Sequence, residues 1–356
     1  MAVIRILPRG GLVRGPLPRG CVLCQRGAKL VLLVTGKCAA GCYYCPLSSE
    51  KAGRDVVFAD ELRVRRPSDI LLEARLIDAE GTGITGGDPL CAPRRTVRYI
   101  RMLKNKFGRE HHIHLYTSGR FSASWIGILA KAGLDEIRFH PAPSTWSRFE
   151  KTGVALMLRK AKDCGMDAGA EVPAIPGKER GLSALARSLG TVGADFLNLN
   201  ELEYSQTNHE KLNDRGFSVR DDISAGVLGS EETARRVLEG FDGETALHYC
   251  SSGFKDGVQL RRRIMRRAKN VARAYEVITP DGTLLKGIIE GPPSLLRRLR
   301  KEFCVPARLS RYDRRRRRVE TAPWVLEKAA SAFRGRSFIV EEYPTADGLE
   351  VERYAP

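Results

Sequence analysis

The sequence predicts an α/β fold, a full or partial (β/α)6 TIM-like barrel, followed by a smaller basic α+β domain. Between residues 29 and 250, short apolar segments alternate with amphipathic segments of helical length, which is typical of repeated βα units. Polar clusters follow the apolar segments, as expected where active-site residues gather at the C-terminal ends of barrel strands. We therefore expect an N-terminal extension at 1–28, a barrel at 29–255 and a C-terminal domain at 256–356.

The strand prediction depends on seven apolar segments. They span residues 29–35, 81–85, 112–118, 134–140, 167–173, 194–200 and 245–250. The amphipathic segments between them predict helices at 68–79, 93–107, 122–132, 145–164, 178–189 and 230–240. Six or seven such units exceed what a small open sheet needs, which favours a barrel.

The C-terminal domain is predicted from a change of pattern after Cys250. A helix at 257–274 would turn four apolar residues inward, namely Leu260, Ile264, Ala268 and Val271. A hairpin follows around Pro280-Asp281-Gly282. Helices at 293–303 and 323–333 and a final hairpin at 336–354 complete the domain.

The chain is strongly basic, and the excess charge is concentrated. The net charge is +18, and residues 255–320 hold 20 Lys and Arg against 7 Asp and Glu, a net +13. Such a field attracts polyanions, and nucleic acid is the commonest of them. A hyperthermophile surface is the alternative, although such surfaces usually pair both signs.

Nine basic residues are the expected nucleic-acid contacts, with aromatic residues nearby that could stack on bases. The basic residues are Arg262, Arg266, Lys269, Arg273, Arg314, Arg315, Arg316, Arg317 and Arg318. The aromatic residues are Tyr275, Tyr312 and Trp324.

Hydropathy and cysteine usage suggest a cytoplasmic protein. The longest apolar stretch is the short segment LVLLV, and Arg, Gly and Pro interrupt the N-terminal segment, so neither a membrane-spanning helix nor a signal peptide is expected. The nine cysteines are an odd number, which does not suggest the disulfide framework of a secreted protein. Closely spaced cysteines in a cytosolic chain are more typical of metal binding.

Three cysteines lie within eight positions, at Cys38, Cys42 and Cys45. Thiolates select soft or borderline metals, and a four-iron cluster normally takes one thiolate for each iron. This loop supplies only three thiolates, so one iron would have no protein ligand. Such an iron could bind a small molecule directly, as catalytic metal sites keep an open position.

The motif Cys38-x3-Cys42-x2-Cys45, with Tyr44 before the last thiol, resembles that of the radical S-adenosylmethionine (SAM) superfamily. Residues 83–89 (GITGGDP) resemble the family's glycine-rich turn, which meets the methionine amino group, and glycines allow such a close approach. Residues 116–119 (YTSG) resemble a turn that touches the cofactor in activating-enzyme relatives. The whole chain resembles an archaeal group related to pyruvate formate-lyase activating enzymes.

This resemblance, over residues 29–250, implies a radical SAM type of barrel that binds a [4Fe-4S] cluster through the three cysteines. It implies reductive cleavage of SAM to methionine and a 5′-deoxyadenosyl radical, with electrons from a reductant such as ferredoxin or flavodoxin. Polar residues at later strand ends suit ribose and carboxylate contacts. The expected cofactor-binding residues are Tyr44, Thr85, Gly86, Gly87, Asp88, Ser118, Arg138, His140, Glu171, Asn198 and Asn200.

A second cysteine pair, Cys21 and Cys24, has the spacing of a metal knuckle. With His111 and His112 it could form a zinc site near the bottom of the barrel; an auxiliary iron–sulfur cluster and a metal-free pair are the alternatives. Among the remaining cysteines, Cys91 and Cys250 could face the active site, although structural roles are favoured. The last two, Cys164 and Cys304, are expected in the core.

Three functions agree with these features. The first is a radical SAM enzyme that modifies RNA, with transfer RNA favoured. The second is an activase or maturase that places a radical or modification on a protein or peptide. The third is a non-enzymatic iron–sulfur or zinc protein that binds nucleic acid. The motif is compatible with methylation, sulfur insertion, carbon-bond formation and simple hydrogen abstraction.

Overall fold

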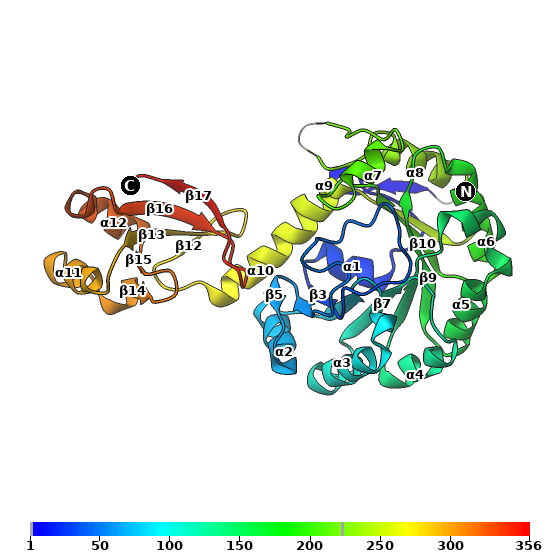
Figure 1. Cartoon of the computed structure of the whole chain (residues 1–356), viewed down its shortest axis with the longest axis horizontal. Helices are drawn as coiled ribbons and strands as arrows, with labels where there is room; N and C mark the ends of the chain where they lie inside the picture. Colours follow the sequence, from blue (N-terminus) through cyan, green and yellow to red (C-terminus); the bar gives the residue numbers. More distant parts are fainter. Residues whose placement is uncertain (1–2, 222–223) are drawn as a thin grey trace. The chain divides into compact units, whose positions relative to one another are not determined.

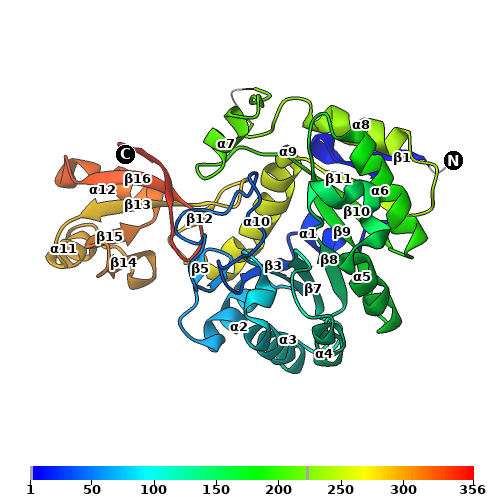
Figure 2. The same ribbon diagram turned by 45° about the vertical axis from the view of Figure 1, so that its right-hand side comes forward.

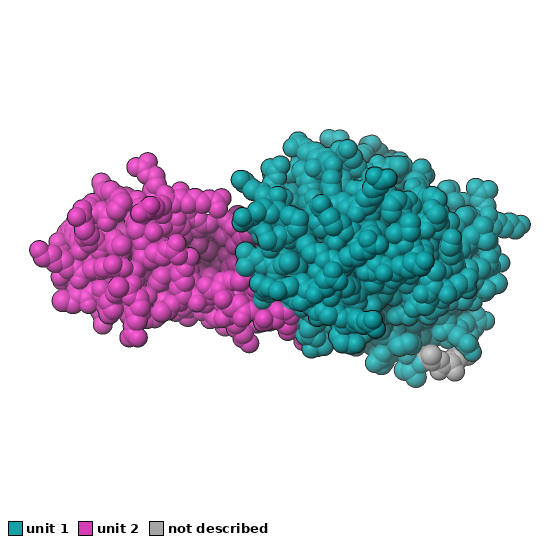
Figure 3. Space-filling view, turned by 90° about the horizontal axis from the view of Figure 1, so that it is seen from below, with its two compact units in different colours: residues 1–75, 79–260 teal, residues 76–78, 261–356 magenta. Residues whose placement is uncertain are grey.

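The computed structural model describes residues 3–221 and 224–356. The chain forms two compact units, coloured separately in Figure 3. Unit 1 comprises residues up to 75 and residues 79–260, and unit 2 comprises residues 76–78 and 261–356. In the part of the chain that is described, no helix has both the length and the apolar composition needed to cross a bilayer.

Unit 1 is built on an 11-stranded sheet in the order β1-β2-β11-β10-β9-β8-β7-β6-β3-β4-β5. Its centre is parallel and contains β3 (Lys29–Leu33), β6 (Gly81–Thr85), β7 (His112–Thr117), β8 (Glu136–Phe139), β9 (Asp167–Ala174), β10 (Phe196–Glu201) and β11 (Ala246–Cys250). Two short antiparallel pairs flank it, β1 (Ile4–Ile6) with β2 (Leu12–Arg14) and β4 (Phe58–Ala59) with β5 (Leu62–Arg63). All seven predicted strands are confirmed, and the barrel is partial.

Amphipathic helices cover the outer side of this curved sheet (Figures 1 and 2). They are α2 (Pro67–Leu76), α3 (Pro93–Phe107), α4 (Ser124–Ala132), α5 (Gly153–Asp163), α6 (Glu179–Thr191) and α8 (Ser230–Glu239), with the short α7 (His209–Asn213) in the loop after β10. The predicted helix 145–164 is wrong in one respect. Extended backbone at Thr152 separates a 3-10 segment, Pro143–Lys151, from α5, and the Thr152 hydroxyl accepts a hydrogen bond from the Ala155 N–H.

The predicted cysteine knuckle is a helix, α1 (Arg19–Gln25), which lies inside the ring of strands (Figure 1). The Gly20 N–H donates to Glu136 Oε2 at 3.2 Å, and Glu136 begins β8, so the start of α1 lies at the bottom of the barrel. A Cβ on Gly20 would lie 2.6 Å from side-chain atoms of Arg138 and His114. The helix fits there because residue 20 is glycine.

Unit 2 contains a six-stranded antiparallel sheet in the order β14-β15-β13-β16-β17, with β12 paired to β13. The strands are β12 (Val277–Ile278), β13 (Leu284–Glu290), β14 (Ser310–Asp313), β15 (Arg318–Thr321), β16 (Ser337–Glu342) and β17 (Glu350–Tyr354). Helices α11 (Ser294–Glu302) and α12 (Pro323–Ala329) bury Leu299 and Leu326 against sheet residues such as Ile289 and Val319. The predicted helices and end hairpin are present, whereas the β14–β15 hairpin was not expected.

The first helix of unit 2 differs from its prediction. A short α9 (Ser252–Phe254) and a π-helical segment, Lys255–Leu260, precede α10 (Arg261–Val271). The interior residues Ile264 and Ala268 are buried as predicted, but Leu260 and Val271 are only half-buried. Arg266, one of the predicted nucleic-acid contacts, donates to the carbonyl of Ile77 at 2.9 Å.

A buried ionic cluster lies within unit 2. Lys286 Nζ lies 2.6 Å from Glu276 and 3.1 Å from Glu342, and Arg318 Nη2 lies 2.7 Å from Glu320. The two predicted nucleic-acid contacts Arg318 and Arg273 belong to this cluster, because Arg273 Nη1 lies 3.2 Å from Glu320. The prediction is therefore wrong for Arg318, which is 4% exposed. The charge of Arg273 is already paired with Glu320, although its side chain is partly exposed.

Candidate functional site

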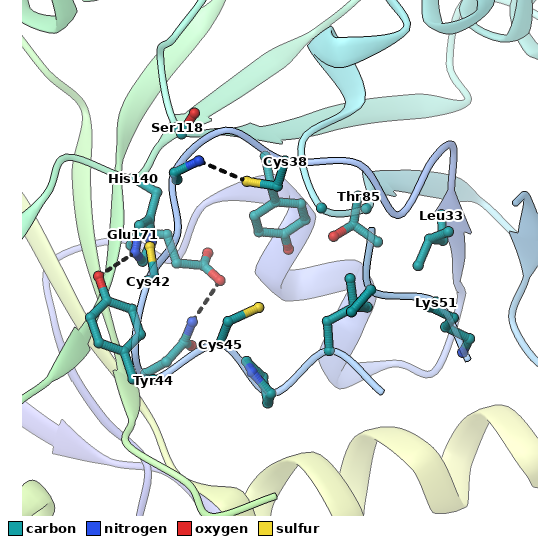
Figure 4. Close-up of a pocket in the computed structure, with 18 of the residues that line it drawn as sticks. Leu33, Cys38, Cys42, Tyr44, Cys45, Lys51, Thr85, Ser118, His140 and Glu171 are labelled. Carbon is teal, nitrogen blue, oxygen red and sulfur yellow. Dashed lines mark hydrogen bonds between the residues drawn. The ribbon is translucent and has the colours of Figure 1, made fainter. Parts of the chain in front are cut away.

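A cavity of about 820 Å³ opens at the C-terminal ends of the parallel strands of unit 1 (Figure 4). The sequence-predicted residues that line it come from the cysteine loop and from five strand ends. They are Cys38, Cys42, Tyr44, Cys45, Thr85, Gly86, Gly87, Ser118, Arg138, His140, Glu171 and Asn200. Two predicted residues, Asp88 and Asn198, are buried behind this lining.

The three thiols lie around one part of the cavity (Figure 4). Cys38 and Cys45 are exposed and Cys42 is half-buried. Cys38 Sγ accepts a hydrogen bond from the Ala40 N–H at 3.3 Å. Burial raises the pKa of the Cys42 thiol above its usual range, and the neighbouring thiols Cys38 and Cys45 raise it further. A metal centre between them would reverse that effect, since coordination deprotonates thiols.

The glycine-rich turn lies directly beneath the cysteine loop. The Gly87 N–H donates to the Thr35 carbonyl at 2.8 Å, and the Asp88 N–H donates to the Lys37 carbonyl at 2.8 Å. A Cβ on Gly87 would lie 2.5 Å from the carbonyl oxygens of Gly36 and Lys37. The missing side chain therefore lets the turn support the loop that carries the thiols.

Asp88 connects this turn to the end of β7. Its carboxylate accepts hydrogen bonds from the Leu90 N–H at 2.9 Å, the Ser118 N–H at 2.9 Å, the Ser118 hydroxyl at 2.6 Å and the Thr117 hydroxyl at 3.1 Å. The residue is 3% exposed. Asp88 thus orients Ser118, which lines the cavity, and does not itself reach the cavity.

Tyr44 and His140 form a hydrogen-bonded pair across the cavity wall. His140 Nδ1 lies 2.7 Å from the Glu171 carbonyl, which can only accept, so Nδ1 carries the proton. His140 Nε2 therefore accepts the hydrogen bond of the Tyr44 hydroxyl at 2.9 Å (Figure 4). Burial lowers the pKa of His140, which agrees with a neutral ring in this tautomer. The pair holds the cysteine loop against the end of β8.

Glu171 is fixed by a set of donors below the cavity. Arg138 Nη1 donates to its carboxylate at 2.7 Å, Asn198 Nδ2 at 3.0 Å and Asn200 Nδ2 at 2.8 Å. Burial alone would raise the pKa of Glu171, but Arg138 and the two amides outweigh it and hold the pKa below its usual range. Glu171 is therefore an ionised, oriented carboxylate in the cavity floor.

Several residues that hold the site were not predicted. Asn208, 1% exposed, donates to the Tyr44 carbonyl at 3.1 Å, and the Arg215 guanidinium lies 4.2 Å from the centre of the Tyr43 ring. Arg120 Nη1 donates to the Ala39 carbonyl at 3.2 Å. No sequence signal marked these long-range contacts. By contrast, Lys255, whose Nζ lies 2.5 Å from Glu203 in the cavity wall, follows the last strand and had a positional signal.

The structure does not gather the proposed Cys2His2 zinc site. Cys21 Sγ accepts hydrogen bonds from Arg138 Nη1 and Asn198 Nδ2, both at 3.4 Å, whereas His111 Nε2 pairs with the Thr82 hydroxyl at 2.8 Å. Cys24 lies beside Lys29. Among the described residues, one set of metal-ligating side chains comes together within 4.8 Å, formed by His112, His114 and Glu136.

The other cysteines differ in burial. Cys250 is buried, while Cys91 is exposed beside the cysteine loop. Cys164 and Cys304 are exposed, so the expectation that they are core residues is wrong. Cys164 directly follows α5, and Cys304 lies two residues after the end of α11.

Comparison with known proteins identifies the family. Residues 32–142 match the model of the Radical SAM superfamily. The chain is also 39% identical, over 95% of its own length and 92% of the relative's, to a Methanocaldococcus jannaschii protein named "Putative glycyl-radical enzyme activating enzyme MJ0021". The chain belongs to the radical SAM superfamily. Its cofactors are accordingly a [4Fe-4S] cluster and SAM, and three thiols beside an 820 Å³ cavity are a donor set that fits them.

Other similarities of this radical SAM enzyme are partial. Residues 282–355 match DUF8061, a domain of unknown function. The "Probable GTP 3',8-cyclase" of Methanopyrus kandleri is 35% identical over 29% of this chain and 31% of its own. The solved methyltransferase TsrM from Kitasatospora setae is 14% identical, covers 72% of this chain and 60% of its own, and has a TM-score of 0.39. Streptococcus suis SuiB is 12% identical, covers 72% and 56%, and has a TM-score of 0.41.

Proposed function

We propose that this radical SAM enzyme is an activase or maturase whose substrate is a protein or peptide. The supporting observation is the relative named as a glycyl-radical enzyme activating enzyme, which aligns with 95% of this chain. The alignment extends through unit 2, so the similarity is not confined to the shared cofactor motif. The RNA-modifying function, favoured from the sequence, has no support from these relatives.

In this proposal Cys38, Cys42 and Cys45 bind the cluster. Bound together, the cluster and SAM supply the one-electron chemistry that removes a hydrogen atom from the substrate. The Tyr44–His140 pair and the Asp88–Ser118 contacts keep the cysteine loop and the end of β7 in place. An external reductant such as ferredoxin or flavodoxin supplies the electron.

The remaining predicted residues are assigned to SAM and substrate by position. Thr85, Gly86, Gly87 and Ser118 line the cavity beside the cysteine loop, and the ionised Glu171 lies below with Asn200. A cavity of about 820 Å³ is near the upper end of the usual range for ligand sites. This volume leaves room for an extended substrate segment beside a nucleotide.

The test uses the reconstituted full chain with dithionite and SAM under anaerobic conditions. Extract of the source organism, grown on fully deuterated amino acids, is divided into portions treated with protease, with ribonuclease or with neither, and each hydrolase is inactivated before the enzyme is added. We expect the released 5′-deoxyadenosine to contain deuterium with the untreated extract and with the ribonuclease-treated extract. With the protease-treated extract it should contain none. Cys42→Ala serves as the control for transfer without the cluster. Transfer that survives protease would refute a protein substrate.

RNA modification remains a second candidate because of one observation. Residues 255–320 hold 20 Lys and Arg against 7 Asp and Glu. In the same experiment, grown instead with deuterated ribonucleosides, this candidate predicts label that ribonuclease removes. The two candidates therefore give opposite results with the two hydrolases.

A further inference from the structure

The run Arg314–Arg318 divides into residues with a structural role and residues without one. Arg318 is buried in the ionic cluster, and Arg316 pairs with Glu342 and donates to the Gly348 carbonyl at 2.7 Å. The side chains of Arg314, Arg315 and Arg317 are exposed and, among the described residues, have no ion pair or hydrogen bond. The fold of unit 2 therefore explains two of the five arginines.

The three remaining arginines belong to a larger basic surface at one edge of the unit 2 sheet. Helix α11 lies beside the edge strand β14 in both ribbon views, and Arg300 Nε on α11 donates to the Ser310 hydroxyl on β14 at 2.9 Å. Exposed arginines without a partner in the described structure occur on this helix, before and on β14, and in the turn after it. We call this set the β14 edge surface: Arg297, Arg308, Arg311, Arg314, Arg315 and Arg317.

Nearby carboxylates do not neutralise this surface. The segment 294–317 contains two acidic residues, Glu302 and Asp313. Glu302 pairs with Arg298 at 3.0 Å. Asp313 Oδ1 accepts hydrogen bonds from the backbone N–H groups of Arg315 and Arg316, at 2.8 and 3.1 Å. In this fully described segment, Asp313 is therefore the one carboxylate without an ion pair, and the six guanidinium groups outnumber it, so the surface keeps a strong positive field.

The composition of the surface favours nucleic acid over protein. Protein interfaces have an apolar or aromatic centre, whereas protein–nucleic acid interfaces are polar and strongly positive. Among the described residues of segment 294–317, no large hydrophobic side chain is exposed. Of the three predicted stacking residues, Tyr275 is buried and Tyr312 packs against the unit 2 core, so neither is available to bases. The third, Trp324, is 44% exposed but lies on α12, outside segment 294–317. The surface suits phosphate backbone and lacks a platform for single-stranded bases.

We propose that the β14 edge surface binds the phosphate backbone of double-helical nucleic acid. Guanidinium groups contact phosphate oxygens in a bidentate manner, and such contacts require no particular base sequence. The contact concerns unit 2 and is independent of which molecule the radical attacks. RNA and DNA duplexes present the same backbone charge, so the experiment distinguishes them.

The test measures fluorescence anisotropy of the full chain with a labelled RNA hairpin, a DNA duplex of the same sequence and polyglutamate. Six phosphate contacts predict a slope of about −5 for log K against log salt, and a loss of about 10³-fold in affinity between 50 and 200 mM salt. In the variant Arg314→Gln/Arg315→Gln/Arg317→Gln, three contacts are lost, so the slope should fall to about −3. The control Arg94→Gln/Arg101→Gln/Lys106→Gln removes the same charge from α3 of unit 1 and should keep the full slope.

Tighter binding of RNA or of DNA identifies the natural duplex, and either result supports the proposal. Equal binding of polyglutamate would instead indicate an acidic protein partner. An equal loss of duplex affinity in both triple variants would show that binding depends only on the net charge of the chain. Exposed arginines also prevent edge strands from pairing between molecules. If that were the only role here, the native chain would not bind the duplex and the β14 variant would dimerise. Each of these last three results would overturn the proposal.

Discussion

Replacement of Asp88 by Asn separates a structural role from a cofactor-binding role for a residue that the sequence assigns to SAM. The carboxylate is 3% exposed and accepts hydrogen bonds from the backbone N–H groups of Leu90 and Ser118 and from the hydroxyls of Thr117 and Ser118. An Asn side chain keeps one accepting oxygen and presents an amide that cannot accept. Whichever way it is turned, its NH2 group faces a backbone N–H.

The expected cost follows from these contacts. If the remaining oxygen keeps the Leu90 bond, Oδ2 is lost as acceptor for the Ser118 N–H at 2.9 Å and the Ser118 hydroxyl at 2.6 Å. Hydrogen bonds to charged groups contribute about 1.5–3 kcal/mol each. The hydroxyl can rotate to another partner, but the N–H cannot, so we expect Asp88→Asn to destabilise unit 1 by about 3 kcal/mol. For a unit of this size that corresponds to a Tm roughly 6–12 °C lower.

Thermal unfolding followed by circular dichroism measures this shift, on protein without cofactors and then with SAM added. Ser118→Ala is the matched control, since it removes one donor and leaves no unpaired amide, and should cost about 1.5 kcal/mol, the lower end of that range, because the carboxylate keeps its other donors. The loss for Asp88→Asn should be present before SAM is added, because it arises within the protein. An unchanged Tm without SAM, combined with weakened SAM binding, would show that Asp88 contacts the cofactor and would refute the structural role.

Three further predictions concern the cluster, its loop and unit 2. Cys42→Ala should remove the brown colour and the visible absorption of the reconstituted protein, whereas Cys91→Ala should keep both. Asn208→Ala should make cluster loss to a chelator about tenfold faster, because the carbonyls of Tyr44 and Glu203 lose a hydrogen-bond donor worth about 1.4 kcal/mol. An unchanged rate would show that Asn208 does not hold the cysteine loop in place. Burial would raise the pKa of Glu320, but Lys286 and Arg318 outweigh it and lower the pKa from 4.5 to about 2. Glu320 therefore contributes about 3 kcal/mol above pH 4.5 that is lost as pH falls towards 2, and urea unfolding of Glu320→Gln should depend less on pH over that range.

Local patterns were sufficient for most of unit 1. Parallel strands covered on both faces appear as apolar runs, and strand β6 and helix α3 begin and end at the predicted residues. Helix α3 has explicit boundary signals, because Pro93 starts it and Gly108, with a φ of +88°, follows it. The cavity residues were predictable for the same reason, since the C-terminal ends of parallel strands meet at one edge.

Helix α1 was not predictable in this way. Its sequence, RGCVLCQ, has the spacing of a metal knuckle, and seven residues are too few to show a helical period. Its position depends on contacts with residues more than 90 positions away: the Gly20 N–H bonds to Glu136, and Cys21 accepts from Arg138 and Asn198. A local pattern contains none of that information.

The run Arg314–Arg318 is a second feature that local sequence could not resolve, and here the structure decides which charges a partner can reach. Arg314 to Arg318 are identical in type, so sequence alone treats them as one cationic patch. The register of β15 against β14 and β13, together with Glu342 from β16, draws Arg316 and Arg318 into ion pairs inside unit 2. Net charge therefore overstates the field available to a partner, since a cation held by a buried carboxylate attracts no counterion from outside. The charges that can release counterions are those without a partner in the fold. Six of them lie on and around β14, whereas Arg266 on α10 and Arg273 after its end are engaged.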